Sequence, residues 1–369
     1  MPKELGHWII AQETARLLGD ASKLNVGEYP RTITHAIQQY PSWFILGSVC
    51  HDCGFYQRDD SYAHLRKMSD RLHGKGMEDS FASVKGLVSH YFADGQGGTS
   101  DGQGGVPDYV LAFAAGALSH IAADTVFHPM IFYYTGITGE DGGLHRHMAF
   151  ESALDQYLQR KYTAPFRGKV KKAYAHAKGL VNEAAFLKCL GVFYSWDAPL
   201  PEHESWRLIR THLRIQRLFS CLPLRLLGRL VYLPYRGSNK DLSSILYPLG
   251  RRPAKFFENQ LEWRNPVTGE HFSASVESLF DQAVLRGKAW IEDLDAFLLA
   301  DGTTDRGEKP AGEVASAVRA ASERVTGGLA CPFSENQSGP CLDMGVPAGS
   351  GEARFFRQPL VEICTSVRR

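Results

Sequence analysis

The stretch Gly116-Ala-Leu-Ser-His120-Ile-Ala-Ala-Asp124-Thr-Val-Phe-His128-Pro129 is the most informative part of the sequence. It continues an apolar run that begins at Tyr109 and is long enough for a buried helix. On an α-helix four residues turn by about 400° and rise by about 6 Å, so His120, Asp124 and His128 form one slowly drifting stripe. Burying such groups without partners costs several kcal/mol. A chain of core hydrogen bonds could supply partners, but the triplet favours metal ions.

The composition is that of a soluble globular protein. The chain has 369 residues, 44% of them hydrophobic and 22% charged, with a net charge of +1. This length suits one large domain or two smaller ones, and near-neutrality argues against a general nucleic-acid-binding surface. The N-terminal residues lack the pattern of an export signal, and no unbroken apolar run has the length of a membrane span. Because the seven cysteines are odd in number and scattered, we expect reduced thiols and a cytoplasmic location.

The periodicity predicts an all-α fold, because convincing alternating strands are almost absent. The expected helices are 7–18 (ending at Gly19), 32–39, 79–93, one that opens near His145, and 273–299. Residues 42–49 are apolar, and a loop is expected from there up to about Ser69. We predict a single large domain over residues 1–300, with its metal-site core at about 5–160. Residues 301–369 are expected to form a partly irregular tail with a short helix near 311–325.

A glycine-rich repeat precedes the central helix. Residues 94–105 contain two copies of Asp-Gly-Gln-Gly-Gly, a composition that excludes regular structure. A lid over the site and a loop insertion without a role are equally compatible with this repeat.

Further candidate ligands flank the central stripe. His147 and Glu151 are four residues apart, so both side chains can reach one ion. Asp52 and His73 lie at loop–helix junctions, and His7 opens the first helix. With the stripe they make a set rich in imidazole and carboxylate and poor in thiolate, which suits Zn²⁺ with open positions for water. Eight ligands are too many for one tetrahedral ion and suit two or three ions that share a carboxylate.

Some neighbouring side chains compete for these roles. His64 also follows Asp52, although His73 is preferred because a helix is expected soon after it. His51 and His64 are otherwise assigned to the surroundings of the site or to the surface, and His145 is set aside because only His147 has the four-residue spacing. Cys50 and Cys53 form a CxxC pair, a weaker zinc or redox candidate because no second CxxC occurs.

These motifs resemble the zinc-dependent phospholipase C family. The family includes secreted bacterial phospholipases C and the catalytic domain of glycosylphosphatidylinositol-specific phospholipase D, with S1/P1 nucleases as more distant relatives. The matching segments are His7-Trp-Ile-Ile, Gly47-Ser-Val-Cys-His-Asp52, Asp70-Arg-Leu-His73-Gly, Gly116 to His128, and Arg146-His147-Met-Ala-Phe-Glu151. They occur in the family's order, and the His-x-x-x-Asp stretch with its trailing His is the most specific.

The resemblance implies a distribution of ligands among ions. One zinc would be held by Asp52, His73, His120 and Asp124, and a second by His128, His147 and Glu151. His7, with Asp124 as bridging carboxylate, would help to hold a third. In the secreted relatives that third ion also binds the amino group and carbonyl of an N-terminal Trp. This sequence starts with Met1-Pro2, so whether the third site is intact stays open.

The function implied is hydrolysis of a phosphodiester, most simply in a phospholipid. Clustered zinc ions generate hydroxide near neutral pH and polarise the phosphoryl group, and we expect Asp52 to orient the attacking water or to act as the base. Two alternatives are an S1/P1-like nuclease and a non-catalytic helical interaction protein that is stabilised by zinc.

Residues 206–232 alternate apolar side chains with arginines, and no acidic residue occurs between Glu204 and Asp241. This pattern fits peripheral contact with an anionic membrane. It also fits a helix whose apolar face packs on the domain while its arginines face water. Contact of the same arginines with nucleic acid is a weaker alternative.

Overall fold

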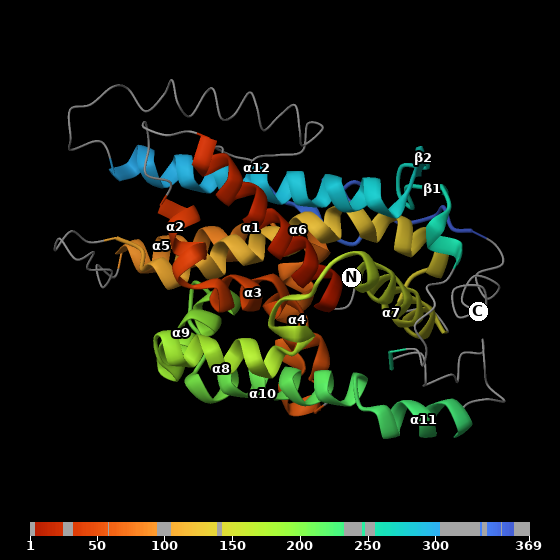
Figure 1. Ribbon diagram of the computed structural model, residues 1–369, viewed down its shortest axis with the longest axis horizontal. Helices are drawn as coiled ribbons and strands as arrows, with labels where there is room; N and C mark the ends of the chain where they lie inside the picture. The colour runs from red at the N-terminus through yellow and green to blue at the C-terminus, as the bar shows by residue number, and fades with distance from the viewer. Residues whose placement is uncertain are drawn as a thin grey trace.

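The computed structural model shows a bundle of helices around one long central helix (Figure 1). The structure describes residues 4–24, 32–57, 59–93, 105–138, 142–231, 246–247, 255–302, 333, 338–347 and 349–357. Over these residues the only strands are four short ones in two hairpins. The predicted all-α fold is confirmed.

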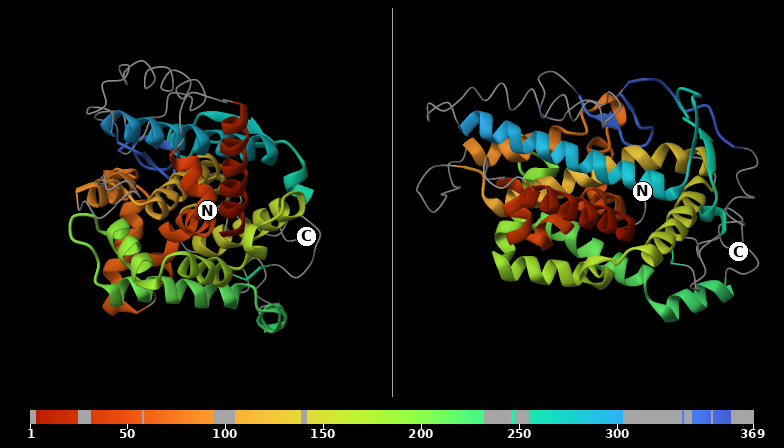
Figure 2. Two further views of the ribbon diagram at one scale, coloured as in Figure 1. Left: turned by 60° about the vertical axis from the view of Figure 1, so that its left-hand side comes forward. Right: turned by 45° about the horizontal axis from the view of Figure 1, so that its top comes forward.

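The central helix α6 (Asp108–Thr135) is the axis of the core. It begins after Pro107 and ends at Gly136, whose positive φ of 74° suits a residue without a Cβ. Its length and composition would allow it to cross a membrane, but its apolar window is entirely buried inside the protein. In both views of Figure 2, α12 (Val276–Gly302) runs alongside α6. The helix is therefore the buried core of a helical bundle.

Helix α3 (Pro41–Cys50) packs on α6 with unusually close backbones. A Cβ on Gly116 would clash with the carbonyl of Phe44, and a Cβ on Gly47 would clash with the carbonyl of Phe113. The two glycines thus face each other's helix and let the backbones touch. As a result, the residues that follow Gly47 are brought directly against the polar stripe of α6.

The N-terminal half agrees with most of the expected elements. Its elements are α1 (Glu4–Leu24), α2 (Thr32–Gln39), α3, η1 (His51–Tyr56), η2 (Asp60–Tyr62), α4 (Ala63–Leu72), η3 (Lys75–Met77) and α5 (Ala82–Ala93). Helix α1 continues through Gly19, where we expected it to end, because Leu18 beside it is buried in the core. The loop expected up to Ser69 is wrong, since α4 buries Leu65, Ser69 and Leu72 on one face.

The second half adds a layer of helices below α3 and α6 and a long helix above them (Figure 1). Its helices are α7 (Gly143–Lys161), η4 (Pro165–Gly168), α8 (Val170–Leu180), α9 (Glu183–Tyr194), α10 (Glu202–Phe219), α11 (Leu222–Val231), η7 (Lys255–Glu258) and α12. The expected helix near His145 is confirmed as α7.

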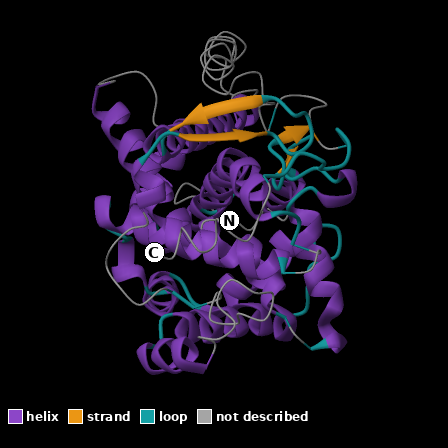
Figure 3. Ribbon diagram, turned by 90° about the vertical axis from the view of Figure 1, so that its right-hand side faces the viewer, coloured by secondary structure: helices purple, strands orange, loops and turns teal. Residues whose placement is uncertain are grey.

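A β-hairpin precedes α12, as Figure 3 shows. Strands β1 (Leu261–Arg264) and β2 (His271–Ala274) pair antiparallel around a turn, where the side chain of Asn265 accepts hydrogen bonds from the backbone N–H groups of Val267 and Thr268. The sequence did not predict these strands, because four residues are too few for a clear alternation. Consequently α12 begins later than the expected Ser273.

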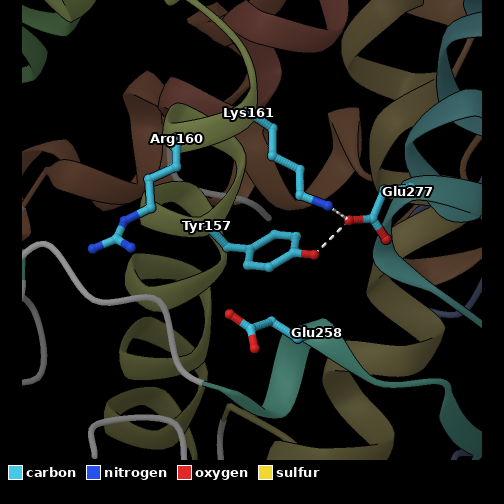
Figure 4. Close-up of a pocket in the computed structure, with 5 residues that line it drawn as sticks. All are labelled: Tyr157, Arg160, Lys161, Glu258 and Glu277. Atoms are coloured by element: carbon cyan, nitrogen blue, oxygen red, sulfur yellow. Dashed lines mark hydrogen bonds and ion pairs between the residues drawn. The ribbon is translucent and has the colours of Figure 1, made fainter.

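The N-terminus of α12 is tied to α7 at the surface (Figure 4). Tyr157 and Lys161 of α7 both donate to the carboxylate of Glu277. Arg160 and Glu258 complete the lining of a cavity of about 390 Å³. None of the eight predicted ligands lines this cavity, so we assign it a structural role.

Part of the C-terminal tail returns to the core. Strands β3 (Pro340–Cys341) and β4 (Val346–Pro347) form a small hairpin, Leu342 is fully buried, and its N–H donates to the carbonyl of His73 (3.0 Å). This segment of the tail, which we expected to be partly irregular, is ordered and packs against the core. The repeat at 94–105, apart from its last residue, and the expected helix near 311–325 lie outside the described residues. The domain boundary at residue 300 stays a prediction.

We predict that Gly116→Ala lowers the free energy of unfolding by about 1–3 kcal/mol, because the added methyl group forces α3 and α6 apart. Urea unfolding measures this change. Gly179→Ala in α8 is the matched control, since nothing lies within 4 Å of a Cβ there. It is expected to stabilise the helix by about 0.5–1 kcal/mol. Equal stability of Gly116→Ala and the wild type would contradict the close contact.

Candidate metal centre

Helix α6 presents His120, Asp124 and His128 along one buried face. Asp124 lies between the two imidazoles: its Oδ2 is 3.1 Å from Nε2 of His120 and its Oδ1 is 3.7 Å from Nε2 of His128. All three side chains are buried. The four-residue spacing therefore gives the stripe that the sequence predicted.

Asp52 and His73, from segments earlier in the chain, lie beside this stripe. Nε2 of His73 lies 3.2 Å from Oδ1 of Asp52 and 3.5 Å from Oδ2 of Asp124. Asp52, His73 and His120 each offer a ligand atom within 4.8 Å of those of the others. Asp52 comes from η1, which directly follows α3, and His73 ends α4. Three segments thus build one group.

His7 approaches the same carboxylate from α1. Its Nε2 is 3.2 Å from Oδ1 of Asp124, and His7, His120 and Asp124 form a second group of possible ligands. The start of α1 is held in place by Asp155 of α7, whose carboxylate accepts from the N–H groups of Leu5 (3.2 Å) and Gly6 (2.9 Å). These two hydrogen bonds fix the position at which His7 enters the core.

A third group is formed by His128, His147 and Glu151. His147 and Glu151 lie one turn apart on α7, with Nε2 and Oε1 at 2.7 Å, and both are buried. The structure therefore brings all eight predicted side chains into one neighbourhood, in three groups. That each of them binds a metal ion stays a prediction.

The hydrogen bonds of two histidines suit a metal site. Nδ1 of His120 donates to the carbonyl of Ser48 (2.9 Å), and Nδ1 of His73 donates to the carbonyl of Ser69 (2.7 Å). In a neutral imidazole the other nitrogen, Nε2, then carries a lone pair, and in both residues Nε2 faces a carboxylate without a hydrogen bond. A lone pair facing a carboxylate oxygen is repulsive, so a positive charge is favoured between the two atoms, and either a proton on Nε2 or a metal ion can supply it. Outer hydrogen bonds of this kind are typical of histidine ligands.

The charges of the site also favour a cation. Burial lowers the pKa of His73, but Asp124 and Asp52 outweigh it and raise this pKa to about 10. Burial raises the pKa of Asp124, yet His128, His120 and His7 hold it well below its usual range. Similarly, burial raises the pKa of Glu151, but His147 outweighs burial and lowers this pKa to about 2. The carboxylates are therefore ionised inside the core, and a divalent cation would neutralise them. The donor set and its charge fit Zn²⁺.

The positions of His64 and His51 bear on two of the alternatives. His64 is exposed and lies 3.1 Å from Glu204, so the structure places His73, and not His64, beside Asp52. His51 is fully buried, which excludes the surface assignment. Its ring stacks on His120 at 4.3 Å between centroids, and His120 stacks on His7 at 4.1 Å. This stack fixes the plane of the His120 ring.

The CxxC pair does not enter the site. Cys50 and Cys53 are both buried free thiols, and Sγ of Cys53 lies 2.8 Å from Nδ1 of His212. Nε2 of His212 is 2.6 Å from Glu4 of α1. Burial raises the pKa of the Cys53 thiol well above its usual value, which disfavours thiolate chemistry. This buried series of contacts, from Cys53 through His212 to Glu4, joins η1, α10 and α1.

One residue at the site was missed by the sequence analysis. Asp343, from the C-terminal hairpin, has Oδ1 3.4 Å from Nδ1 of His128 and Oδ2 3.5 Å from Nζ of Lys75. No spacing signal connects it to the other residues, because it lies far along the chain in a segment of irregular composition.

We predict that His120→Ala and Asp124→Ala each lose at least one equivalent of zinc per chain. His120 belongs to two of the three groups, and Asp124 lies within 3.7 Å of four histidines. Metal analysis after dialysis measures the loss, and the stabilisation of the wild type by added zinc should shrink in parallel. His64→Ala, an exposed histidine on α4, is the matched control and should keep its zinc. Full retention by His120→Ala would contradict the assignment.

Comparison with known proteins agrees with this geometry. A family model described as zinc dependent phospholipase C matches residues 6–195, a range that contains all eight predicted ligands. No curated protein and no solved structure matches the chain. The match covers more than half of the chain, and so the protein belongs to the zinc-dependent phospholipase C family.

Proposed function

We propose that the protein hydrolyses the phosphodiester bond of a phospholipid at this centre. The observation that supports the proposal best is the environment of Asp124. Its carboxylate oxygens lie within 3.1–3.7 Å of four imidazoles, those of His7, His73, His120 and His128. A carboxylate surrounded in this way can be shared between neighbouring ions, which is the arrangement that phosphoryl chemistry uses.

The zinc ions, when bound, would polarise the phosphoryl group and lower the pKa of water to about 7. The chain supplies the groups that hold and orient the reactants. Both oxygens of Asp52 are buried without a hydrogen bond, so this carboxylate can accept a proton from a water molecule or orient it. The stack of His51 on His120, with Phe193 against His51 (4.9 Å between ring centroids), is fully buried and excludes bulk water from the inner side of the site.

We further propose that α10 and α11 contact an anionic membrane surface. On α11, Leu222, Leu226, Leu227 and Leu230 are between 50% and 71% exposed. The helix lies at the edge of the molecule beyond the end of α10 (Figures 1 and 2). Exposed leucines in one place are uncommon on a protein surface without a partner. The apolar face that could have packed on the domain is thus largely open to solvent.

The charges beside these leucines complement anionic lipid. Arg210, Arg214 and Arg217 of α10 are exposed, and no acidic residue occurs from Ser205 to Val231. Arginines attract an anionic surface, while leucines enter the headgroup boundary. A cytoplasmic protein with this surface would reach its substrate at the inner face of a membrane.

The substrate prediction is tested with four compounds: phosphatidylcholine, phosphatidylinositol, an aryl phosphodiester and single-stranded DNA. We expect diacylglycerol and a phosphorylated headgroup from one or both phospholipids. Asp52→Asn should lower the rate by at least about 100-fold if it acts as a base, whereas His64→Ala should not. Cleavage of DNA alone would favour the nuclease alternative, and zinc without any turnover would favour the non-catalytic one.

The membrane prediction is tested by co-sedimentation with vesicles of phosphatidylcholine, with and without phosphatidylserine. We expect binding to the anionic vesicles, and Leu227→Ser with Leu230→Ser should weaken it by about 30–1,000-fold, because each leucine contributes roughly 1–2 kcal/mol when buried. Leu144→Ser, an exposed leucine on α7, is the control. Unchanged binding of the double variant, or a dimer through α11 in light scattering, would contradict the proposal.

A further inference from the structure

The C-terminal hairpin places one carboxylate beside the metal centre. Asp343 is only 15% exposed, and its Oδ1 lies 3.4 Å from Nδ1 of His128. The other oxygen of the carboxylate, Oδ2, lies 3.5 Å from the ammonium of Lys75. The carboxylate therefore lies between a buried imidazole and an ammonium group.

The two nitrogens of His128 face different partners. Nε2 faces Asp124 at 3.7 Å, on the side of the predicted ligands, whereas Nδ1 faces Asp343. A neutral imidazole has one donor and one acceptor nitrogen. A carboxylate at Nδ1 favours the tautomer with the proton there, which leaves the Nε2 lone pair directed to the metal side. Serine carbonyls do the same for His120 and His73.

The hairpin is held at this position by contacts on two sides. The N–H of Leu342 donates to the carbonyl of His73 (3.0 Å), and Nδ2 of Asn265 donates to the carbonyl of Met344 (2.9 Å). Gly345 has a φ of +64°, and a Cβ there would lie 2.7 Å from the carbonyl of Thr125. Pro129 leaves that carbonyl without its usual helical donor. The hairpin thus packs against the turn of α6 that carries His128.

We propose that Asp343 is a positioning residue of the metal centre: its carboxylate, 3.4 Å from Nδ1 of His128, would favour the proton at Nδ1 and leave Nε2 to bind the ion shared with His147 and Glu151. Asp343 lies outside the range that the family model matches, residues 6–195. The proposal rests on the zinc centre of the proposed function and not on its substrate. Partners of this kind raise the basicity of a histidine ligand and fix its orientation.

The test measures zinc retention without any substrate. Asp343→Ala and Asp343→Asn are loaded with zinc, and release to a coloured chelator is followed in time. We expect one equivalent of zinc to be bound about 10–100-fold more weakly in Asp343→Ala, with Asp343→Asn in between. Asp343→Glu should recover part of the affinity. The matched control is Glu352→Ala, which removes an exposed carboxylate from the same tail.

Two further measurements separate positioning from other roles. Cobalt replaces zinc, and its visible spectrum should change in Asp343→Asn and not in Glu352→Ala, because the spectrum reports the ligands around the ion. The melting temperature of the chelated protein should be the same for Asp343→Asn and the wild type.

A lower melting temperature with unchanged zinc release and cobalt spectrum would show a merely structural role and overturn the proposal. Faster hydrolysis with unchanged zinc release would also overturn it, in favour of a cover over the site. Absence of phospholipase activity would leave the zinc readout intact, so the two proposals fail separately.

Discussion

The close contact between the backbones of α3 and α6 is the constraint on which the site depends. Gly47 and Gly116 each lie where a side chain would collide with the other helix. Because the helices touch there, the carbonyl of Ser48 reaches Nδ1 of His120. The chain then turns into η1, which delivers His51 to the ring stack and Asp52 to the ligands. Bulkier residues at Gly47 or Gly116 would separate Asp52 from His120 in the group that these two residues form with His73.

The electrostatics of the core follow from that geometry. Ionised carboxylates inside a protein are stable only when opposite charge or hydrogen bonds compensate for lost hydration. Here the compensation for Asp124 comes from four imidazoles, while serine carbonyls take the outer N–H of two of them. The arrangement can also accommodate a divalent cation, because three groups of these side chains bring their ligand atoms within 4.8 Å of one another. Membership of the zinc-dependent phospholipase C family supports zinc as that cation.

Much of the fold was predictable because helical periodicity is a local property. Residues 32–39 were bounded correctly, since Pro41 cannot continue a helix. Where prediction failed, tertiary burial overrode the local signal: α1 continues through Gly19, α4 occupies part of an expected loop, and the hairpin before α12 was missed. In the site, spacing and resemblance named all eight candidate ligands, and the structure brings their side chains together in three groups. His51 was underestimated and Asp343 was missed.

The sequence by itself determined that His120, Asp124 and His128 share a face, because four residues make slightly more than one helical turn. The same reason placed Glu151 beside His147. Only the tertiary structure decided that Asp52 meets His73 instead of His64, that three imidazoles stack, and that a carboxylate from the tail reaches His128. These contacts join segments far apart in the chain. They depend on how whole helices pack, which no local pattern of residues encodes.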